Sequence, residues 1–390
     1  MSSTIGVIAP EFPPDVGGME RFAASLVGSI AKAGVAVVVV TRSREMPDDY
    51  NESRVTVVTG LCGFEKADRE LILRYDSGVI GWCVLNAAYT WVVQYVKPVI
   101  LTIHGNDFLN PNPTYRDEKW SKLIRGFSDR LEFASAQFRT KRSIGEYVGS
   151  ATAVTANSAK TLEMFSSRFG KLDCETLVSY CGVGDAFFEG LLKNGGVPIS
   201  IITGGRLNEC RKNFSGLIRA MRVLEDRDPG RFVLSVFGDG DARSVLENLV
   251  SELNLDNSVK FIGRPPNSEL PLILREHQIF AMVPKREQKS FEGFGIVYLE
   301  ALASGLAVVC GKHTGFAELA SEKNHCVVAQ GETEHDIAAA IVECDRILAN
   351  SDRNTTRGFA EQFRWDRVAA KYLDLINRHF NRGRLDAEKL

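Results

Sequence analysis

The sequence lacks long apolar runs and a strong net charge. No stretch of about 18 apolar residues occurs in its 390 positions, so we expect no membrane-spanning segment. The amino terminus, M-S-S-T-I-G-V-I-A-P, has no basic leader before a signal-type apolar core, so export by a simple signal is not expected. Its 47 basic and 49 acidic residues give a net charge of -2, which argues against a nucleic-acid-binding protein.

Clustered metal ligands and a complete dinucleotide fingerprint are also missing. The eight cysteines are scattered, without a CxxC pair or a His/Cys cluster, so we expect reduced thiols in a cytoplasmic protein. The glycine loops lack the full fingerprint with an acidic residue about 20 positions further on. This argues against an NAD-dependent dehydrogenase.

Strand-like and helix-like segments alternate in both halves of the chain. Strands are predicted in the first half at 5–9, 35–41, 55–58, 79–85, 99–103 and 151–156, and in the second at 199–203, 232–237, 259–262, 279–283, 306–310 and 326–329. Continuous apolar strands are typical of parallel sheets covered on both faces. The alternation therefore predicts an α/β fold with two doubly wound, Rossmann-like domains.

The polar, glycine-rich segment 191–198 is the predicted hinge between these domains. We assign 1–190 to the first domain and 199–365 to the second. The tail after 337 has helical spacing and no further strand to serve, and its last helix, 366–385, is expected to complete the first domain.

A glycine-punctuated loop runs into an apolar segment at 290–305. A helix beginning at Ile296 would point its free amides and the positive end of its dipole at the loop, which favours an anion such as phosphate. Glu300 would lie about one turn inside this helix and would need hydrogen-bond donors, such as a sugar diol. An ordinary helix start with an acidic first turn explains the same residues equally well.

Other unusual residues follow predicted strands, where ligands bind in open α/β sheets. His104 follows 99–103, and the pair Gly17-Gly18 allows a close backbone approach before a helix. Arg206 and Lys212 flank a turn and could clamp a diphosphate. The alternatives are that Arg206 and Lys212 are solvated surface charges, that His104 is an ordinary hydrogen-bonded polar residue and that the two glycines serve only to reverse the chain. Ser158 is expected to cap a helix.

Taken together, these residues resemble the family-four group of retaining nucleotide-sugar glycosyltransferases. Their GT-B fold has two facing Rossmann-like domains and a C-terminal helix that crosses back to the first. The resemblance spans nearly the whole chain, through 13–20, 181–184, Arg206 with Lys212, 238–240, the E-x7-E pair Glu292 and Glu300, 314–318 and 363–365.

The resemblance implies a role for each matching residue. Arg206 and Lys212 would hold the donor diphosphate, Glu300 the ribose and Glu292 the donor sugar. The remaining expected contacts are the amides of Phe294, Gly295 and Ile296, the backbone near Gly263 and Arg264 at the base, Gly17 and Gly18 at the phosphates, and His104 at the donor sugar. His104, Glu292, Arg206 and Lys212 are the expected catalytic residues. Arg211 stands where the family usually has its lysine, so either Arg211 or Lys212 could bind the diphosphate.

The expected activity is retaining transfer of a hexose from a UDP-sugar, with GDP-mannose as the second donor candidate. The expected acceptor is a glycan or a lipid-linked precursor of cell-surface polysaccharide or lipopolysaccharide. No cofactor or metal is expected, because no Asp-x-Asp motif stands at a plausible donor loop. Alternatives are a nucleotide-sugar epimerase on the same fold and a non-catalytic nucleotide-sugar-binding subunit.

The segment 116–142 holds eight basic and four acidic residues, with apolar residues at helical spacing. Such a helix could rest on an anionic bilayer, which would place a cytoplasmic protein on the inner face of the plasma membrane. Packing of the apolar stripe on the sheet is the alternative.

Overall fold

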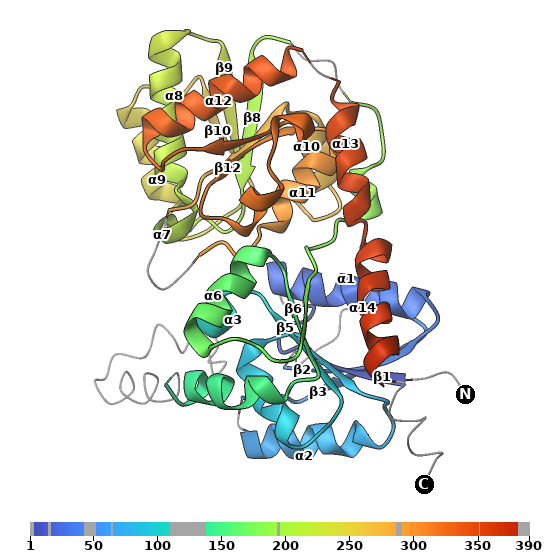
Figure 1. The fold of residues 1–390 in the computed structure, drawn as a ribbon. Coiled ribbons are helices and arrows are strands. Elements are labelled where there is room, and N and C mark those ends of the chain that lie inside the picture. The colour runs from blue at the N-terminus through green and yellow to red at the C-terminus, as the bar shows by residue number, and fades with distance from the viewer. Residues whose placement is uncertain are drawn as a thin grey trace. The chain divides into compact units, whose positions relative to one another are not determined.

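The chain forms two compact units. The first comprises Met1–Gly182 with Trp365–Leu390, and the second Val183–Arg364. The computed structural model describes residues 4–14, 17–42, 52–63, 65–109, 138–192, 196–285, 291–350 and 352–380 (Figure 1). Residues 183–190, assigned above to the first domain, lie with the second unit.

The first unit is built on a seven-stranded sheet with order β3-β2-β1-β4-β5-β6-β7, and its strand pairs are parallel. The strands are β1 (Thr4–Ile8), β2 (Ala36–Thr41), β3 (Val55–Thr59), β4 (Trp82–Val84), β5 (Val99–Ile103), β6 (Ala153–Ala156) and β7 (Glu175–Val178). Its helices include α1 (Gly18–Lys32), α2 (Glu65–Asp76), α3 (Asn106–Leu109), α6 (Ala159–Phe169) and α14 (Trp365–Phe380). The order reverses between β1 and β4, so this is the sheet's topological switch point.

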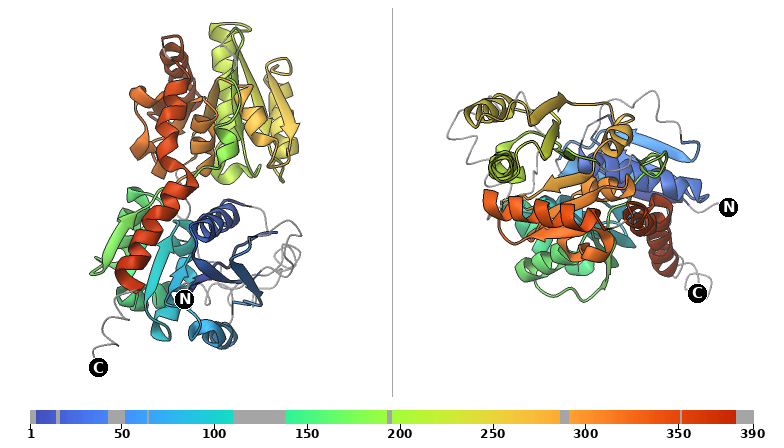
Figure 2. Two further views of the ribbon diagram at one scale, coloured as in Figure 1. Left: turned by 90° about the vertical axis from the view of Figure 1, so that its right-hand side faces the viewer. Right: turned by 90° about the horizontal axis from the view of Figure 1, so that it is seen from above.

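The C-terminal helix α14 packs on α1 in the first unit. Figure 2 shows this helix in dark red beside the blue and cyan elements of that unit. Its Trp365 ring covers Gly182, where an added Cβ would lie 2.3 Å from the ring. Deeper in the unit, the Tyr372 hydroxyl lies 3.2 Å from the hydroxyl of Thr102 and 3.0 Å from that of Thr155.

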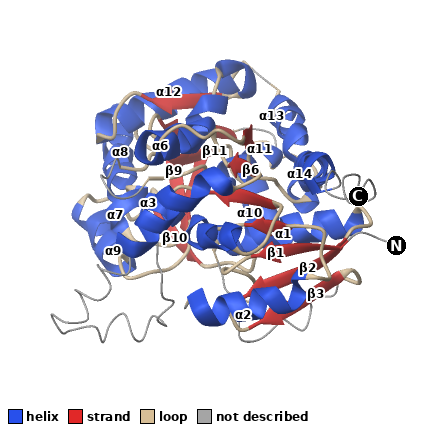
Figure 3. Cartoon of the chain, turned by 60° about the horizontal axis from the view of Figure 1, so that its bottom comes forward, coloured by secondary structure: helices blue, strands red, loops and turns tan. Residues whose placement is uncertain are grey.

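The second unit has a six-stranded sheet of order β10-β9-β8-β11-β12-β13, again with parallel pairs. The strands are β8 (Ile199–Gly204), β9 (Phe232–Phe237), β10 (Val259–Gly263), β11 (Ile279–Met282), β12 (Ala307–Gly311) and β13 (Cys326–Ala329). The helices are α7 (Glu209–Lys212), α8 (Phe214–Arg227), α9 (Arg243–Glu252), α10 (Leu270–Arg275), α11 (Ile296–Ala303), α12 (Glu334–Leu348) and α13 (Asn354–Ala360). In Figure 3 the red strands of each unit lie among blue helices. Here the order reverses between β8 and β11.

The structure confirms the two doubly wound α/β units and differs from the predicted elements in detail. The strand predicted at 79–85 is only Trp82–Val84. Strand β7 was not predicted, because this partly exposed edge strand, E-T-L-V, has no apolar run. The tail that was predicted to be helical consists of three separate α-helices, α12, α13 and α14. Ser158 caps α6 as expected, since its hydroxyl accepts a hydrogen bond of 3.0 Å from the Thr161 amide.

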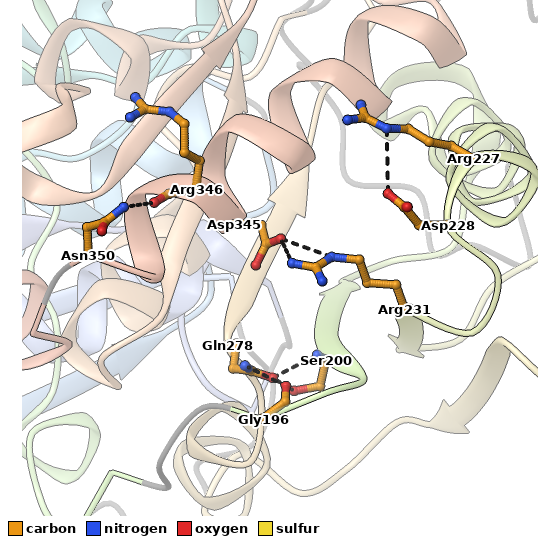
Figure 4. Close-up of polar contacts among 9 residues, drawn as sticks. All are labelled: Gly196, Ser200, Arg227, Asp228, Arg231, Gln278, Asp345, Arg346 and Asn350. Carbon is orange, nitrogen blue, oxygen red and sulfur yellow. Dashed lines mark hydrogen bonds and ion pairs between the residues drawn. The ribbon is translucent and has the colours of Figure 1, made fainter.

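Gln278 joins the beginnings of β8 and β11 in the second unit (Figure 4). Its carbonyl oxygen accepts from the Ser200 amide at 2.9 Å and from the Ser200 hydroxyl at 3.0 Å, and its amide donates to the Gly196 carbonyl at 3.3 Å. Because Gln278 is buried, these groups have little access to replacement water.

Replacing Gln278 by alanine should therefore destabilise the second unit by about 1–3 kcal/mol, the cost of leaving a buried donor without its acceptor. The measurement is the shift in urea midpoint. Asn350→Ala, which removes an exposed bond to the Arg346 carbonyl in the same region, is the control and should change stability by less than about 0.5 kcal/mol. Equal shifts would contradict the assigned role of Gln278.

Candidate functional site

Three charged side chains meet at the switch point of the second unit. The Glu292 carboxylate, in the loop between β11 and α11, lies 3.5 Å from the Arg211 guanidinium and 3.6 Å from the Lys212 ammonium, both on α7 after β8. Lys212 and Glu292 are each only 13% exposed. The Lys212 ammonium also lies 3.4 Å from the Met282 sulfur. Two cations therefore converge where open α/β sheets bind ligands.

The two cations keep Glu292 ionised. Burial alone would raise the pKa of this carboxyl, but Lys212 and then Arg211 outweigh it, and the pKa lies below its ordinary value. Neither pair has the short geometry of a strong hydrogen-bonded ion pair. The cations thus retain capacity for a second anion.

Helix α11 begins at Ile296, as the sequence predicts, and its N-cap is Gly295. Gly295 has φ of +85°, a left-handed conformation that favours glycine. No side chain caps this helix, so its first-turn amides are not satisfied by an N-cap side chain. Phe294 is buried beside Phe316, and Glu300 is buried one turn into the helix.

The predicted Gly238–Gly240 loop has a structural explanation. The Gly238 amide donates to the Gly263 carbonyl at 2.6 Å, and a Cβ on Gly238 would lie 1.8 Å from the Gly205 carbonyl oxygen. Glycine is required for this close approach of backbones, rather than for a dinucleotide. The loop thereby supports the Gly205 turn that carries Arg206.

Arg206 and Arg264 are exposed in the second unit. Arg206 forms no ion pair with any side chain in the described part of the chain, in contrast to Arg211 and Lys212. Gly263 ends β10 with φ of +71° and open space beside its Cα. The structure thus joins Arg211, Lys212 and Glu292 directly. It places Arg206 on the loop after β8, Gly263 at the end of β10 and Arg264 directly after it.

His104 follows β5 in the first unit and is 8% exposed. Its ring packs edge-on against Phe22, with centroids 4.7 Å apart, and its Nε2 has no hydrogen-bond partner. Burial lowers the pKa of His104 to about 4, so the imidazole is neutral at pH 7. Asp107 accepts hydrogen bonds from the amides of His104 and Gly105 and fixes this turn.

Gly17 and Gly18 lie at the start of α1, also in the first unit. Gly17 is the N-cap and contributes no side chain, and nothing lies within 4 Å of the position of a Gly18 Cβ. The backbone of Gly18 is therefore open to a close approach.

The low pKa of His104 makes the stability of the first unit sensitive to acid. The fold disfavours the protonated ring, so its contribution is complete above the ordinary pKa of 6.5 and is lost as pH falls toward about 4. Relative to His104→Gln, the wild type should lose about 2–3 kcal/mol between pH 7 and pH 4.5. Urea titrations at both pH values measure the difference.

Asp107 titrates with the opposite sign, since burial raises its pKa from 3.8 to about 6, so its contribution to stability is lost as pH rises between those two values. Asp107 is present in both proteins, so its effect cancels in the comparison. A His104→Gln difference that does not change with pH would contradict a neutral, buried imidazole.

Two predictions concern the membrane. The basic segment 116–142 lies outside the described residues except for 138–142, which are helical. Within the described residues, no helix combines the length and apolar character needed to cross a bilayer.

A second polar cluster, in the first unit, was not predicted from the sequence. Glu11 and Asn86 follow β1 and β4, the two strands at the switch point, and their side chains are hydrogen-bonded. Asn86 could have been found from its position directly after a predicted strand, but the contact with Glu11 depends on strand order.

Comparisons with known proteins match this architecture. The model of Glycosyltransferase Family 4 matches residues 16–186, and that of Glycosyl transferases group 1 matches residues 186–357. A GDP-mannose-dependent α-(1-6)-phosphatidylinositol monomannoside mannosyltransferase of Mycobacterium tuberculosis is 31% identical over 175 residues. That alignment covers 43% of this chain and 44% of the mycobacterial enzyme, less than half of either.

Two other similarities extend over most of the chain. The α-monoglucosyldiacylglycerol synthase of Streptococcus pneumoniae is 22% identical over 90% of this chain and 79% of its own. The crystal structure of Anabaena HepE in complex with UDP superposes with a TM-score of 0.72 at 16% identity, covering 96% of this chain and all of HepE, and this likeness shows the fold alone. The two family models together match 16–357, and the chain therefore belongs to the family-four glycosyltransferases with the GT-B fold.

Proposed function

We propose that this glycosyltransferase moves a hexose, with retention of configuration, from a nucleoside diphosphate sugar to a glycan or lipid-linked acceptor of cell-surface polymers. The observation that carries the donor assignment is the convergence of Arg211 and Lys212 on a buried carboxylate at the switch point. A lipid-linked acceptor is supported by the names of two relatives. The mycobacterial one is a phosphatidylinositol monomannoside mannosyltransferase, and the streptococcal one is an α-monoglucosyldiacylglycerol synthase.

The reaction breaks the bond between the anomeric carbon and a diphosphate oxygen, so negative charge grows on the leaving diphosphate. Arg206 with Arg211 or Lys212 stabilises that charge, and the amides of Phe294, Gly295 and Ile296 add the positive end of α11. Because these side chains supply the positive charge, the proposed reaction needs no metal.

Three further contacts complete the donor site. Glu300 accepts hydrogen bonds from the ribose hydroxyls. Glu292 orients the sugar, while the diphosphate replaces Glu292 as the partner of Arg211 and Lys212. The backbone at Gly263 and Arg264 reads the base. From the first unit, Gly18 approaches the phosphates, and the neutral His104 imidazole contacts the sugar hydroxyls.

A thermal-shift panel tests the donor assignment, since a ligand that binds only the native state raises its stability. UDP, GDP, ADP and their sugars are compared, with UDP-sugars and GDP-mannose as the expected donors. No shift with any of them would overturn the proposal. Arg206→Ala and Glu300→Ala should lose the shift, whereas His104→Ala should keep it and lose transfer.

Product analysis with a radiolabelled donor tests the reaction. Transfer to an added lipid extract, undiminished by EDTA, is the expected result, whereas an epimerised donor or binding without turnover would identify the alternative functions. Nuclear magnetic resonance of the new linkage determines whether configuration is retained.

Co-sedimentation with anionic vesicles at low salt tests the membrane role of 116–142, and absence of binding would exclude it.

A further inference from the structure

Glu11 occupies the switch point of the first sheet. It follows β1, and the Asn86 amide, following β4, donates to both of its carboxylate oxygens at 3.1 and 3.3 Å. Glu292 occupies the corresponding point of the second sheet, since it lies in the loop that follows β11 and contacts two cations that follow β8. Each unit therefore has a carboxylate where a doubly wound sheet binds ligands.

The orientation of Asn86 is fixed by the backbone. Its carbonyl oxygen accepts from the Ala88 amide at 2.9 Å, so its NH2 group must face Glu11. A carboxylate oxygen can accept about two hydrogen bonds, and Asn86 supplies one to each. Glu11 is thus held in place with acceptor capacity remaining.

The two neighbouring acids differ from Glu11 in their partners. Asp107 accepts from the amides of Ala87, His104 and Gly105, at 2.8–3.2 Å. Asp68 accepts from the amides of Cys62 and Gly63 and from the Tyr89 hydroxyl. Both therefore fix loops, whereas the side-chain hydrogen bonds to Glu11 come from a single amide group, that of Asn86, beside one from its own backbone.

The charge around Glu11 selects against an anion. Arg42, the cation that lowers the pKa of Glu11, donates to the Tyr89 hydroxyl at 3.1 Å, and among the described residues no ion pair joins it to Glu11. Burial raises the pKa of Glu11, while Arg42 and the Asn86 bond act against the rise. Hydroxyl donors would stabilise this carboxylate, whereas a phosphate would repel it.

We propose that Glu11, positioned by Asn86, is the acceptor-binding carboxylate of the first unit, and that it receives a hydroxyl of a neutral sugar rather than a phosphorylated group. This inference rests on the proposed transfer reaction. It makes Glu11 a determinant of acceptor choice, separate from the donor residues. Asp107 and Asp68 hold the surrounding loops and do not contact the acceptor.

The test uses neutral and phosphorylated probes with the full chain. Saturation-transfer NMR is recorded with methyl α-D-mannopyranoside, methyl α-D-glucopyranoside and mannose 6-phosphate, each in the presence of UDP or GDP. The wild type should bind a neutral hexoside and discriminate against the phosphate. Glu11→Gln should weaken neutral binding, or raise the KM for the acceptor, by about 10- to 100-fold without changing the KM for the donor.

Glu163→Gln, the same change on an exposed face of α6, is the control and should leave both constants unaltered. Retained nucleotide thermal shifts in Glu11→Gln show that the variant is folded. If the wild type shows no nucleotide shift, the proposed function fails. If nucleotides bind but neutral hexosides do not, or bind equally to wild type and Glu11→Gln, or the phosphate is preferred, the Glu11 assignment is overturned.

Discussion

Lys212→Ala is expected to lower the rate of sugar transfer by about 10²- to 10³-fold, the usual loss when one preorganised charge at the leaving group is removed. Lys212 is 13% exposed and lies 3.6 Å from Glu292, so its position is fixed before the donor arrives. A buried ammonium loses little to reorganisation when negative charge develops beside it. Transfer is measured with the donor that gives the largest thermal shift.

The loss must be separated from an effect on Glu292. Without Lys212, burial acts on Glu292 with only Arg211 in opposition, so its pKa rises toward or above its ordinary value. The double variant Lys212→Ala/Glu292→Gln removes this complication, because the neutral amide has no charge to compensate. It should transfer sugar more slowly than the single Glu292→Gln variant if Lys212 acts on the diphosphate.

Arg211→Ala in parallel decides which cation binds the diphosphate. Lys323→Ala changes an exposed lysine of the same unit and should leave transfer unaltered. If Lys212→Ala retained the wild-type rate while Arg211→Ala lost it, the diphosphate would be assigned to Arg211. Full activity in both would remove this cluster from the donor site.

Most strands of the fold are visible in the sequence because buried parallel strands require continuous apolar runs. The strand at Val99–Ile103 has the predicted bounds, and so does Phe232–Phe237. The edge strand Glu175–Val178 was not predicted, because this partly exposed strand contains no continuous apolar run. The other three edge strands, β3, β10 and β13, were predicted, so the apolar content of a strand, and not its place in the sheet, decides whether it is visible in the sequence.

The sequence indicates which loops carry ligand-binding residues but not which of them meet. Lys212 and Glu292 follow strands, and parallel strands bring such loops to one edge. Their contact, and that of Glu11 with Asn86, depends on β8 lying beside β11 and β1 beside β4. Strand order arises from the packing of whole helices on the sheet, and apolar runs do not encode it.

Gly295→Ala should destabilise the second unit by about 2–5 kcal/mol, from about 1–2 for a left-handed alanine and about 1–3 for crowding. An added Cβ would lie 2.7 Å from the Tyr298 ring. The Tyr298 ring is held in place, because its centroid stacks 4.7 Å from that of Phe316 and its hydroxyl donates to the Met282 carbonyl at 2.8 Å. The strain must therefore move the start of α11.

Gly358→Ala is the matched control for this change. Gly358 lies within α13 with nothing within 4 Å of its added Cβ, so alanine there should stabilise the unit by about 0.5–1 kcal/mol. Urea midpoints give both values. The opposite signs would show that the loop conformation, and not the loss of a glycine, causes the effect, whereas similar shifts would contradict the left-handed geometry of Gly295. Since the first-turn amides of α11 move with Gly295, its variant should also lose part of the nucleotide thermal shift that Gly358→Ala retains.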